Sequence, residues 1–507
     1  MIRAKNLARS WVRGAAVVLA AVVGTSLTAC ATDEPTVDAT TATMTQLVVG
    51  ATLEPNTLDF STSSEAAIGQ LLLYNVYETL VKVDDTGAIQ PLLATSWEQS
   101  DDRLTYTFHL DPAAHFASGT PVDAEAVVAS IERLKPAANS NVSGPLGLVD
   151  EAAAVDAQTL TVTLTRPSNS WLYDMTAMAG IVVDPAAGDL ATQPAGSGPY
   201  QLSDWIQGDR IGLARDDAYW GQPGAFETVE FRYYSDPNTM SSAMLSGDID
   251  IISDLTTPGS VDAFNDQSKF QVIEGTSTGE VTLGFNHDRP GLQDLRVRQA
   301  INYGIDRQAL MDTVWGGKGL LIGSMVTPTD PYFEDLSQTY PYDPAKAQAL
   351  LVEAGQTDLT LQLRTPVIPY ATAAAQVVAS QLGEIGITVT VEEIDFATWL
   401  TQVYQNGDYD LTIVNHAEPR DLVQFSDPDY YWHYNNPEFN ELMAEADAAP
   451  ADEYVPLMQQ AARILADDAA ADWLFLFPHL VVAKVGIDGI PANSASLSFD
   501  LSTITAG

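Results

Sequence analysis

The chain has 507 residues, of which 46% are hydrophobic, and its 67 acidic side chains far outnumber its 23 basic ones. The formal charge of −44 repels nucleic acids and anionic lipid headgroups, which excludes both as partners bound by charge. This many apolar residues can bury several hydrophobic cores, and typical domain sizes predict two to four domains.

The first thirty residues predict export. Four basic residues precede an apolar run at 14–23, which is the pattern of a signal peptide over residues 1–29. The run is shorter than the roughly 18 residues of a membrane-spanning helix, so no span is predicted here. Because the four basic residues of this segment have no acidic counterpart, the chain that follows it carries a formal charge of about −48.

Cys30 is the one cysteine of the chain, which excludes an intramolecular disulfide. Residues 27–30 resemble the bacterial lipobox, in which the cysteine is diacylated and becomes the first residue of the mature protein. We therefore expect a lipid anchor at Cys30 that holds the protein on the outer face of the cell membrane. Residues 31–45 are rich in Thr, Asp, Glu and Pro, and should complete a flexible tether over 30–45.

The first half of the folded chain is predicted to mix strands and amphipathic helices. Apolar residues recur at three- and four-residue steps over 64–80, which predicts a helix. Asp123 is placed to cap a second helix that runs to residue 133. A third helix is expected at 238–245, and strands are expected at 46–50, 105–110, 160–165, 229–234, 249–252 and 281–286.

The second half alternates strands with helices, which predicts an α/β sheet. A long helix at 296–314 is followed by one at 344–354 that Gly355 ends. Strands are then expected at 359–364, 387–392, 410–414, 473–477 and 481–484, and helices at 373–385, 396–405, 437–447 and 452–466.

Several segments resemble, in the same order, the extracellular solute-binding proteins of family 5, whose members include dipeptide, oligopeptide and nickel binders. The most recognisable stretch is 116–124, although Asp111 and Ala117 depart from the usual family residues. Further matching segments lie at 91–97, 106–110, 196–200, 294–300, 342–347 and 353–355. The resemblance covers residues 47–500.

This resemblance implies an α/β, two-lobed periplasmic-binding-protein fold of type II, similar to cluster C, with a small domain inserted in the first lobe. The implied division places the first lobe at 46–80, 195–288 and 474–507, the insertion at 81–194, and the second lobe at 289–473. It also implies a monomer that closes around a small solute and delivers it to an ABC permease and its ATPase. Neither enzymatic activity nor a cofactor is expected.

The loop after the strand at 410–414 holds the first candidate binding residues, because ligands of α/β sheets bind beyond the carboxyl ends of strands. In peptide-binding relatives an acidic residue of this loop pairs with the peptide amine, and Glu418 is the first candidate here and Asp421 the second. Arg420 suits a peptide carboxylate, with an ion pair to Asp421 or Glu418 as the alternative. His416 is a further candidate.

Other candidate residues lie farther along the chain and in the first lobe. Tyr430, Tyr431 and Trp432 could stack on a ligand or belong to the core. His416 and His433 lack the spacing of a metal motif, and a structural role is expected for them in preference to metal binding. Two first-lobe turns complete the set, with Asn56, Thr57 and Leu58 in one and Thr278 within 277–280 in the other.

No catalytic motif competes with binding. Residues 196–198 lack the spacing of a nucleophile elbow, and residues 316–319 lack the pattern of a phosphate-binding loop. Two acidic residues and an arginine in one loop favour a zwitterion, so di- or oligopeptides are the expected ligands. A nickel or metal-chelate binder is the alternative, followed by an opine or sugar binder.

Overall fold

The computed structural model describes residues 44–507 of the chain. The predicted signal peptide, Cys30 and nearly all of the predicted tether lie outside these residues. Between residues 44 and 507, no helix is both long and apolar enough to cross a membrane. We use the names first lobe, insertion and second lobe for the residue ranges of the predicted division.

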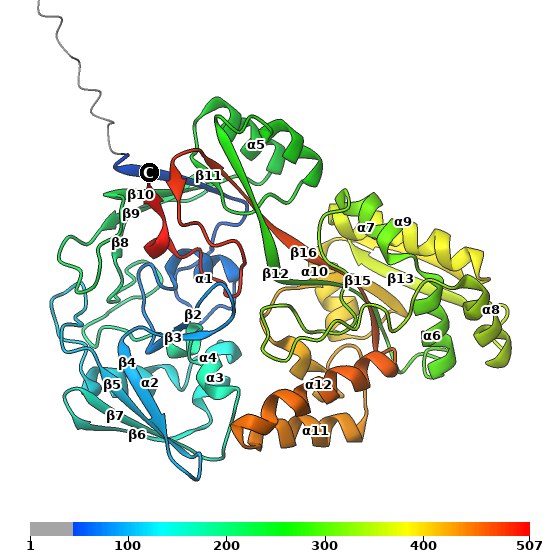
Figure 1. Cartoon of the computed structure of the whole chain (residues 1–507), viewed down its shortest axis with the longest axis horizontal. Coiled ribbons are helices and arrows are strands. Elements are labelled where there is room, and N and C mark those ends of the chain that lie inside the picture. Colours follow the sequence, from blue (N-terminus) through cyan, green and yellow to red (C-terminus); the bar gives the residue numbers. More distant parts are fainter. Residues whose placement is uncertain (1–43) are drawn as a thin grey trace, which may run out of the picture. The chain divides into compact units, whose positions relative to one another are not determined.

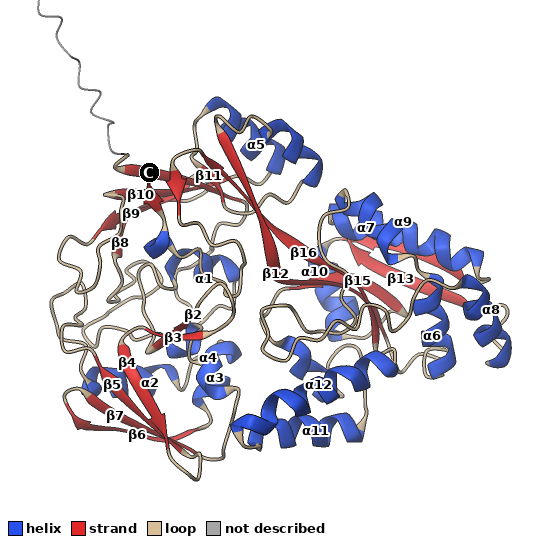
Figure 2. Ribbon diagram, viewed as in Figure 1, coloured by secondary structure: helices blue, strands red, loops and turns tan. Residues whose placement is uncertain are grey.

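A ten-stranded mixed sheet runs through both lobes (Figures 1 and 2). Strands β14, β13 and β15 are parallel to one another, as are β10, β1 and β11, whereas the remaining pairs are antiparallel. In spatial order the strands are β14 (Thr388–Ile394), β13 (Thr360–Pro366), β15 (Leu411–His416), β12 (Phe270–Phe285), β16 (Ala471–Lys484), β11 (Ile251–Ile252), β1 (Gln46–Ala51), β10 (Thr228–Tyr233), β9 (Arg210–Arg215) and β8 (Tyr200–Ile206).

The two longest strands, β12 and β16, connect the lobes as an antiparallel pair (Figure 1). Their pairing shifts register between Thr276 and Glu280, where β12 contains more residues than the facing part of β16. Within this interruption, the Ser277 hydroxyl donates to the carbonyl of Phe477 at 2.8 Å. The ladder is therefore interrupted at the crossover, where a bend between the lobes costs the fewest hydrogen bonds.

The second lobe packs its helices in two groups. Helices α6 (Leu295–Gly304) and α7 (Arg307–Trp315) replace the single helix predicted at 296–314, because Asp306 accepts the N–H of Ala309 at 3.0 Å and caps a new helix. The other helices of this lobe are α8 (Pro344–Glu353), α9 (Pro369–Glu384), α10 (Phe396–Trp399), the π-helix η3 (Leu400–Gln405), the short η4 (Asp421–Ser426), α11 (Pro437–Ala448) and α12 (Ala451–Asp467). Helices α11 and α12 pack against each other, apart from the sheet that α7 and α9 cover (Figure 1).

The insertion contains a separate antiparallel sheet of four strands with the order β4-β5-β7-β6. Asp123 accepts the N–H of Ala126 at 2.9 Å and caps α2, as predicted. The strands are β4 (Ala94–Gln99), β5 (Thr105–Leu110), β6 (Val149–Asp156) and β7 (Thr159–Leu164), and the helices are α2 (Ala124–Leu134), α3 (Ser140–Leu146), α4 (Trp171–Asp174) and η1 (Met178–Gly180). The remaining elements are α1 (Ala66–Leu72), α5 (Pro237–Ser246), η2 (Pro258–Phe264), η5 (Leu501–Thr503) and the two-stranded pairs β2 (Val81–Val83) with β3 (Ile89–Pro91) and β17 (Ile487–Asp488) with β18 (Thr505–Ala506).

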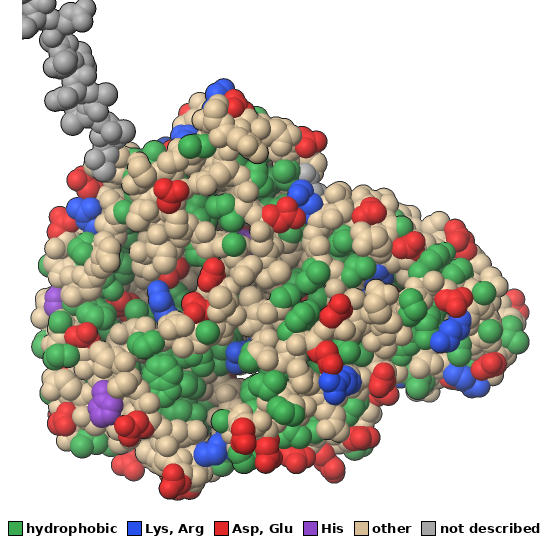
Figure 3. Space-filling model, viewed as in Figure 1, with side chains coloured by type: hydrophobic (Ala, Val, Ile, Leu, Met, Phe, Trp, Pro, Cys, Tyr) green, Lys and Arg blue, Asp and Glu red, His purple; other side chains and the backbone are tan. Residues whose placement is uncertain are grey.

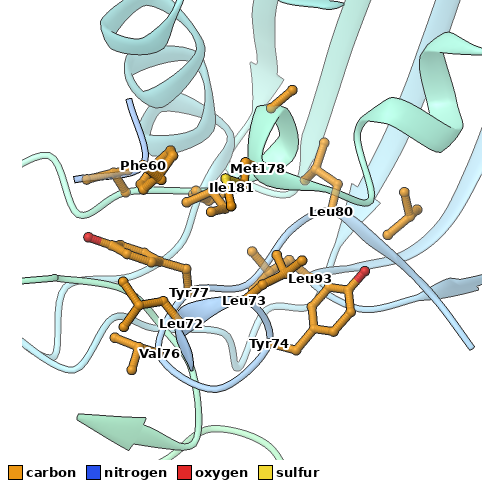
Figure 4. Packing of buried hydrophobic residues seen from close by; sticks show 14 of the residues in the cluster. Phe60, Leu72, Leu73, Tyr74, Val76, Tyr77, Leu80, Leu93, Met178 and Ile181 are labelled. Atoms are coloured by element: carbon orange, nitrogen blue, oxygen red, sulfur yellow. The ribbon is translucent and has the colours of Figure 1, made fainter. Parts of the chain in front are cut away.

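The helix predicted over 64–80 is wrong in its second half. Helix α1 ends at Leu72, and Tyr74 adopts a positive φ of 64°, which a helix does not allow. Residues 71–81 are all buried, so the chain packs apolar side chains on every side instead of on one helical face. Figure 4 shows this packing around Tyr77, which contacts Phe60 with a ring separation of 5.2 Å.

Candidate functional site

A cavity of about 830 Å³ lies between the two lobes, within the range of about 300–1,000 Å³ that small-ligand pockets occupy. Figure 3 shows a hollow in the surface where the lobes face each other. The wall combines apolar and charged side chains from the first lobe, the insertion and the second lobe. Among them are Leu73, Arg166, Tyr173, Asp174, Met178, Tyr332, Glu418, Arg420, Asp421, Val423, Met443, Asp447, Tyr454, Met458 and Leu497.

The loop that follows β15 forms the charged part of this wall. Arg420 adopts a left-handed conformation with φ of 60°, a turn that non-glycine residues seldom make. Glu418, Arg420 and Asp421, the three charged candidates predicted from the sequence, all line the cavity. The strand β15 ends at His416, directly before this loop, so the loop lies beyond the carboxyl end of the strand as predicted.

Arg420 extends from the second lobe to the insertion. Its guanidinium carbon lies 3.4 Å from the ring centroid of Tyr173, and its Nε lies 3.5 Å from Oδ1 of Asp330. The ion pair is therefore with Asp330, not with the two acidic residues of its own loop. Among residues 44–507, Nε of Arg420 has no hydrogen-bond partner, and the side chain, which is 13% exposed, lines the cavity.

Asp421 is an acid in an unusual environment. Its side chain is 3% exposed, and within the described chain neither carboxylate oxygen has a hydrogen-bond donor. Burial raises the pKa of Asp421 well above its usual value, and the negative charges of Glu418 and Asp330 raise it further. Asp174 faces the cavity from the insertion, and burial raises its pKa to about 7 against the opposing effect of Arg420.

Most other predicted residues lie outside the cavity wall. Tyr431 and Trp432 are buried in the core of the second lobe, and Tyr430 packs beside them. His416 is 8% exposed, and its Nε2 lies 2.9 Å from the hydroxyl of Tyr431. Burial lowers the pKa of His416 to about 4, so the ring is neutral at pH 7.

The first-lobe candidates are engaged in local contacts. Asn56 donates to Glu65 from both its backbone and its side chain, at 3.0 and 3.1 Å. The hydroxyl of Thr57 accepts the N–H of Asp59, while Leu58 is fully buried. Thr278 donates to the carbonyl of Ala417 at 2.8 Å and so connects the crossover strand to the charged loop. A binding role for these residues stays a prediction.

The sequence alone missed three aromatic residues of the wall. Tyr173, Tyr332 and Tyr454 surround Arg420 from the insertion and from two distant parts of the second lobe. No local pattern marks them, because only the folded chain brings these positions together. Within the described residues, no group of three His, Cys, Asp or Glu side chains is placed to hold a metal ion.

A polar contact joins the insertion to the second lobe at the cavity edge. The carboxylate of Asp447, at the end of α11, accepts hydrogen bonds from Arg166 Nη1 at 2.5 Å, Ser168 Oγ at 2.8 Å, and the N–H groups of Asn169 and Ser170 at 3.0 and 3.1 Å. The Asn169 side chain donates in turn to the carbonyls of Ala446 and Ala449. We name this contact the Asp447 contact.

Comparisons with known proteins agree with this architecture. The chain is 29% identical over 485 residues to the probable D,D-dipeptide-binding periplasmic protein DdpA of Escherichia coli, covering 88% of this chain and 91% of the relative. It is 27% identical over 370 residues to the dipeptide-binding protein of the same organism, covering 66% of this chain and 69% of that protein. The crystal structure of the ABC transporter substrate-binding protein CtaP from Listeria monocytogenes superposes with a TM-score of 0.80 at 22% identity, covering 92% of this chain and 99% of that chain.

The family pattern described as bacterial extracellular solute-binding proteins, family 5 Middle, matches residues 88–442. This span covers well over half of the chain and includes nearly all of the insertion, the crossover strand β12 and the charged loop. The chain therefore belongs to the family 5 bacterial extracellular solute-binding proteins.

Proposed function

We propose that this protein is the lipid-anchored binding component of an ABC importer and that it captures short peptides in the cavity between its lobes. The observation that carries the proposal is the pair of adjacent basic and acidic residues at the cavity wall, Arg420 and Asp421. Within the described chain, Nε of Arg420 and both carboxylate oxygens of Asp421 are buried without a hydrogen-bond partner. A peptide zwitterion supplies a carboxylate for the first and an ammonium for the second.

The rest of the wall suits the body of a peptide. Met178, Met443, Met458 and Leu497 offer apolar contacts without fixed shape, since methionine adapts to different side chains. The names of the two relatives above refer to dipeptides, which supports the same ligand class. Closure requires no covalent chemistry, because a ligand that contacts both lobes favours the closed state by its differential affinity for that state.

Thermal unfolding of residues 44–507 tests the proposal. The panel comprises di- and tri-L-alanine, D-alanyl-D-alanine, N-acetylated and C-amidated forms of each, and a nickel–histidine chelate. A ligand at 100 times its Kd stabilises the folded state by about 2.7 kcal/mol, which raises Tm by several degrees. We expect free peptides to raise Tm and each blocked form to raise it less.

Variants at the charged loop identify the site. Asp421→Asn and Arg420→Lys should each reduce the peptide-induced shift. Asp429→Asn is the matched control, because Asp429 is an exposed acidic residue nearby that does not line the cavity. A panel in which only the nickel chelate raises Tm would replace peptides by metal chelates as the ligand class.

A further inference from the structure

Glu280 is a buried acid at the crossover between the lobes. It follows the register shift of β12 directly and lies opposite His416 of β15 in the antiparallel ladder. Residues paired in this way point to the same face of the sheet, with Cβ atoms about 4.5–5.5 Å apart. Nδ1 of His416 lies 3.7 Å from Oδ2 of Asp421. Glu280, His416 and Asp421 therefore form one buried group, and Asp421 is its member at the cavity wall.

This group has more hydrogen-bond acceptors than the protein satisfies. Glu280 is 2% exposed and its Oε2 has no donor, and both oxygens of Asp421 are also without donors in residues 44–507. His416 does not compensate, because it is neutral at pH 7 and its Nε2 is engaged with Tyr431. Two unpaired carboxylates buried side by side are strongly disfavoured, so the pair needs at least one proton or one external cation.

The surrounding charged groups do not supply that cation. Asp330 and Glu418 add negative charge, and Tyr431 is uncharged at neutral pH. Arg420, the nearby cation, is held by Asp330 and by the ring of Tyr173. Burial, followed by the charges of Asp421 and Asp330, raises the pKa of Glu280 well above its usual value. Two acids in such an environment titrate as one pair.

We propose that Glu280 and Asp421 share a proton in the ligand-free protein and release it when an ammonium group of the ligand binds at Asp421. This inference rests on the proposed peptide function and adds Glu280 as a residue that positions the proton. The balance is simple: a carboxylic acid loses H⁺ to solvent, and the carboxylate that remains pairs with the ligand ammonium. Because Glu280 directly follows the register shift of the crossover strand β12, the charge of the bound ligand acts next to this interruption of the ladder.

The first test measures protons by calorimetry with tri-L-alanine as the probe at pH 7, in phosphate and in Tris, which differ in ionisation enthalpy. We expect the wild-type protein to release about one proton per peptide, and its affinity to rise up to tenfold per pH unit between pH 5 and 7. Glu280→Gln and Asp421→Asn should each reduce the released proton to less than half and flatten the pH dependence. Binding by the wild type without proton release would overturn the proposal.

The second test needs no ligand. A pKa raised in the folded state means that stability is lost as pH rises from the ordinary carboxyl value through the raised one. Glutamine does not ionise, so the Tm of Glu280→Gln minus that of the wild type should increase from pH 5 to pH 8. Glu151→Gln, at an exposed position of β6, is the matched control and should show no such trend.

The two tests separate the two proposals. A pH-dependent difference for Glu280→Gln together with no binding of any peptide would refute peptide capture but support the proton-sharing pair. If the Tm of Glu280→Gln minus that of the wild type does not change with pH, the proton-sharing pair is refuted, even if tri-L-alanine binds.

Discussion

The Asp447 contact should set how firmly the two lobes stay closed. In Asp447→Asn, the side chain keeps its shape and one of its oxygens. Its new NH₂ group faces Nη1 of Arg166, and because both groups are donors this hydrogen bond is lost. Three hydrogen bonds from Ser168, Asn169 and Ser170 lose their charge assistance, which is worth about 1 kcal/mol each at most. The pair with Arg166, whose side chain is 54% exposed, adds about 0–1 kcal/mol.

Because these terms are not additive, we expect a total loss of about 2 kcal/mol, which corresponds to about 30-fold in the closing equilibrium. Hydrogen exchange measures this opening without a ligand. The N–H of Ser170 is bonded to the carboxylate of Asp447, and the N–H of Asn169 is bonded to both the carboxylate and the backbone carbonyl of Asp447, so both amides become exposed when the contact opens. Their exchange should be about 30-fold faster in Asp447→Asn than in the wild type and unchanged in Asp429→Asn. The Kd for tri-L-alanine should rise by up to the same factor. Unchanged protection of both amides would refute the reasoning.

Three further predictions concern single residues. Arg420→Lys should weaken binding of tri-L-alanine at least tenfold but leave binding of its C-terminal amide unchanged, because lysine lacks the planar guanidinium that matches a carboxylate. If calorimetry shows equal losses of affinity for both peptides, Arg420 does not bind the peptide carboxylate. Glu78 is buried with a pKa raised to about 7 by burial, despite hydrogen bonds from Tyr219 and Ser197. The wild type should therefore lose stability relative to Glu78→Gln as pH rises from about 4.5 through 7, which Tm measured against pH will show. Asp123→Ala removes the cap of α2 and should lower the free energy of unfolding, measured in urea, by about 1 kcal/mol. A decrease under about 0.3 kcal/mol would contradict a stabilising role of this cap.

The Asp447 contact and the Glu280 pair respond oppositely to acid. Burial alone would raise the pKa of Asp447, but hydrogen bonds from Arg166, Ser170 and Ser168 outweigh it and leave the pKa below its usual value. Its stabilising effect is therefore present above the ordinary carboxyl pKa and is lost only as pH falls below that value. The Glu280 pair takes up its proton at higher pH, so mild acid should weaken ligand binding before it loosens the contact between the lobes.

Local signals were sufficient for many elements and for the charged loop. The cap at Asp123, the helix end before Gly355 and the strand before Glu418 each depend on residues near in sequence. The loop after a strand end is where ligands of α/β sheets usually bind, so Arg420 and Asp421, which line the cavity, could be chosen as candidates from the sequence.

Non-local packing explains what the sequence did not reveal. Residues 73–80 leave the helix because they are buried on all sides, which apolar spacing does not distinguish from a helical face. The strands predicted at 473–477 and 481–484 are one strand, since β12 pairs with β16 through the intervening residues. Tyr173 lines the cavity because the insertion folds back toward a loop about 250 residues later, and no local pattern contains that information.

The ten-stranded sheet that both lobes share has a consequence for how the protein unfolds. Strand β12 contributes Val281 and Leu283 to the core of the second lobe, while Val272 packs against a core of the first lobe. Neither lobe can lose its structure without removing two hydrogen-bonded strands from the other. Residues 44–507 should therefore denature as one cooperative unit, with a single calorimetric transition, even if the lobes bend relative to each other at the crossover.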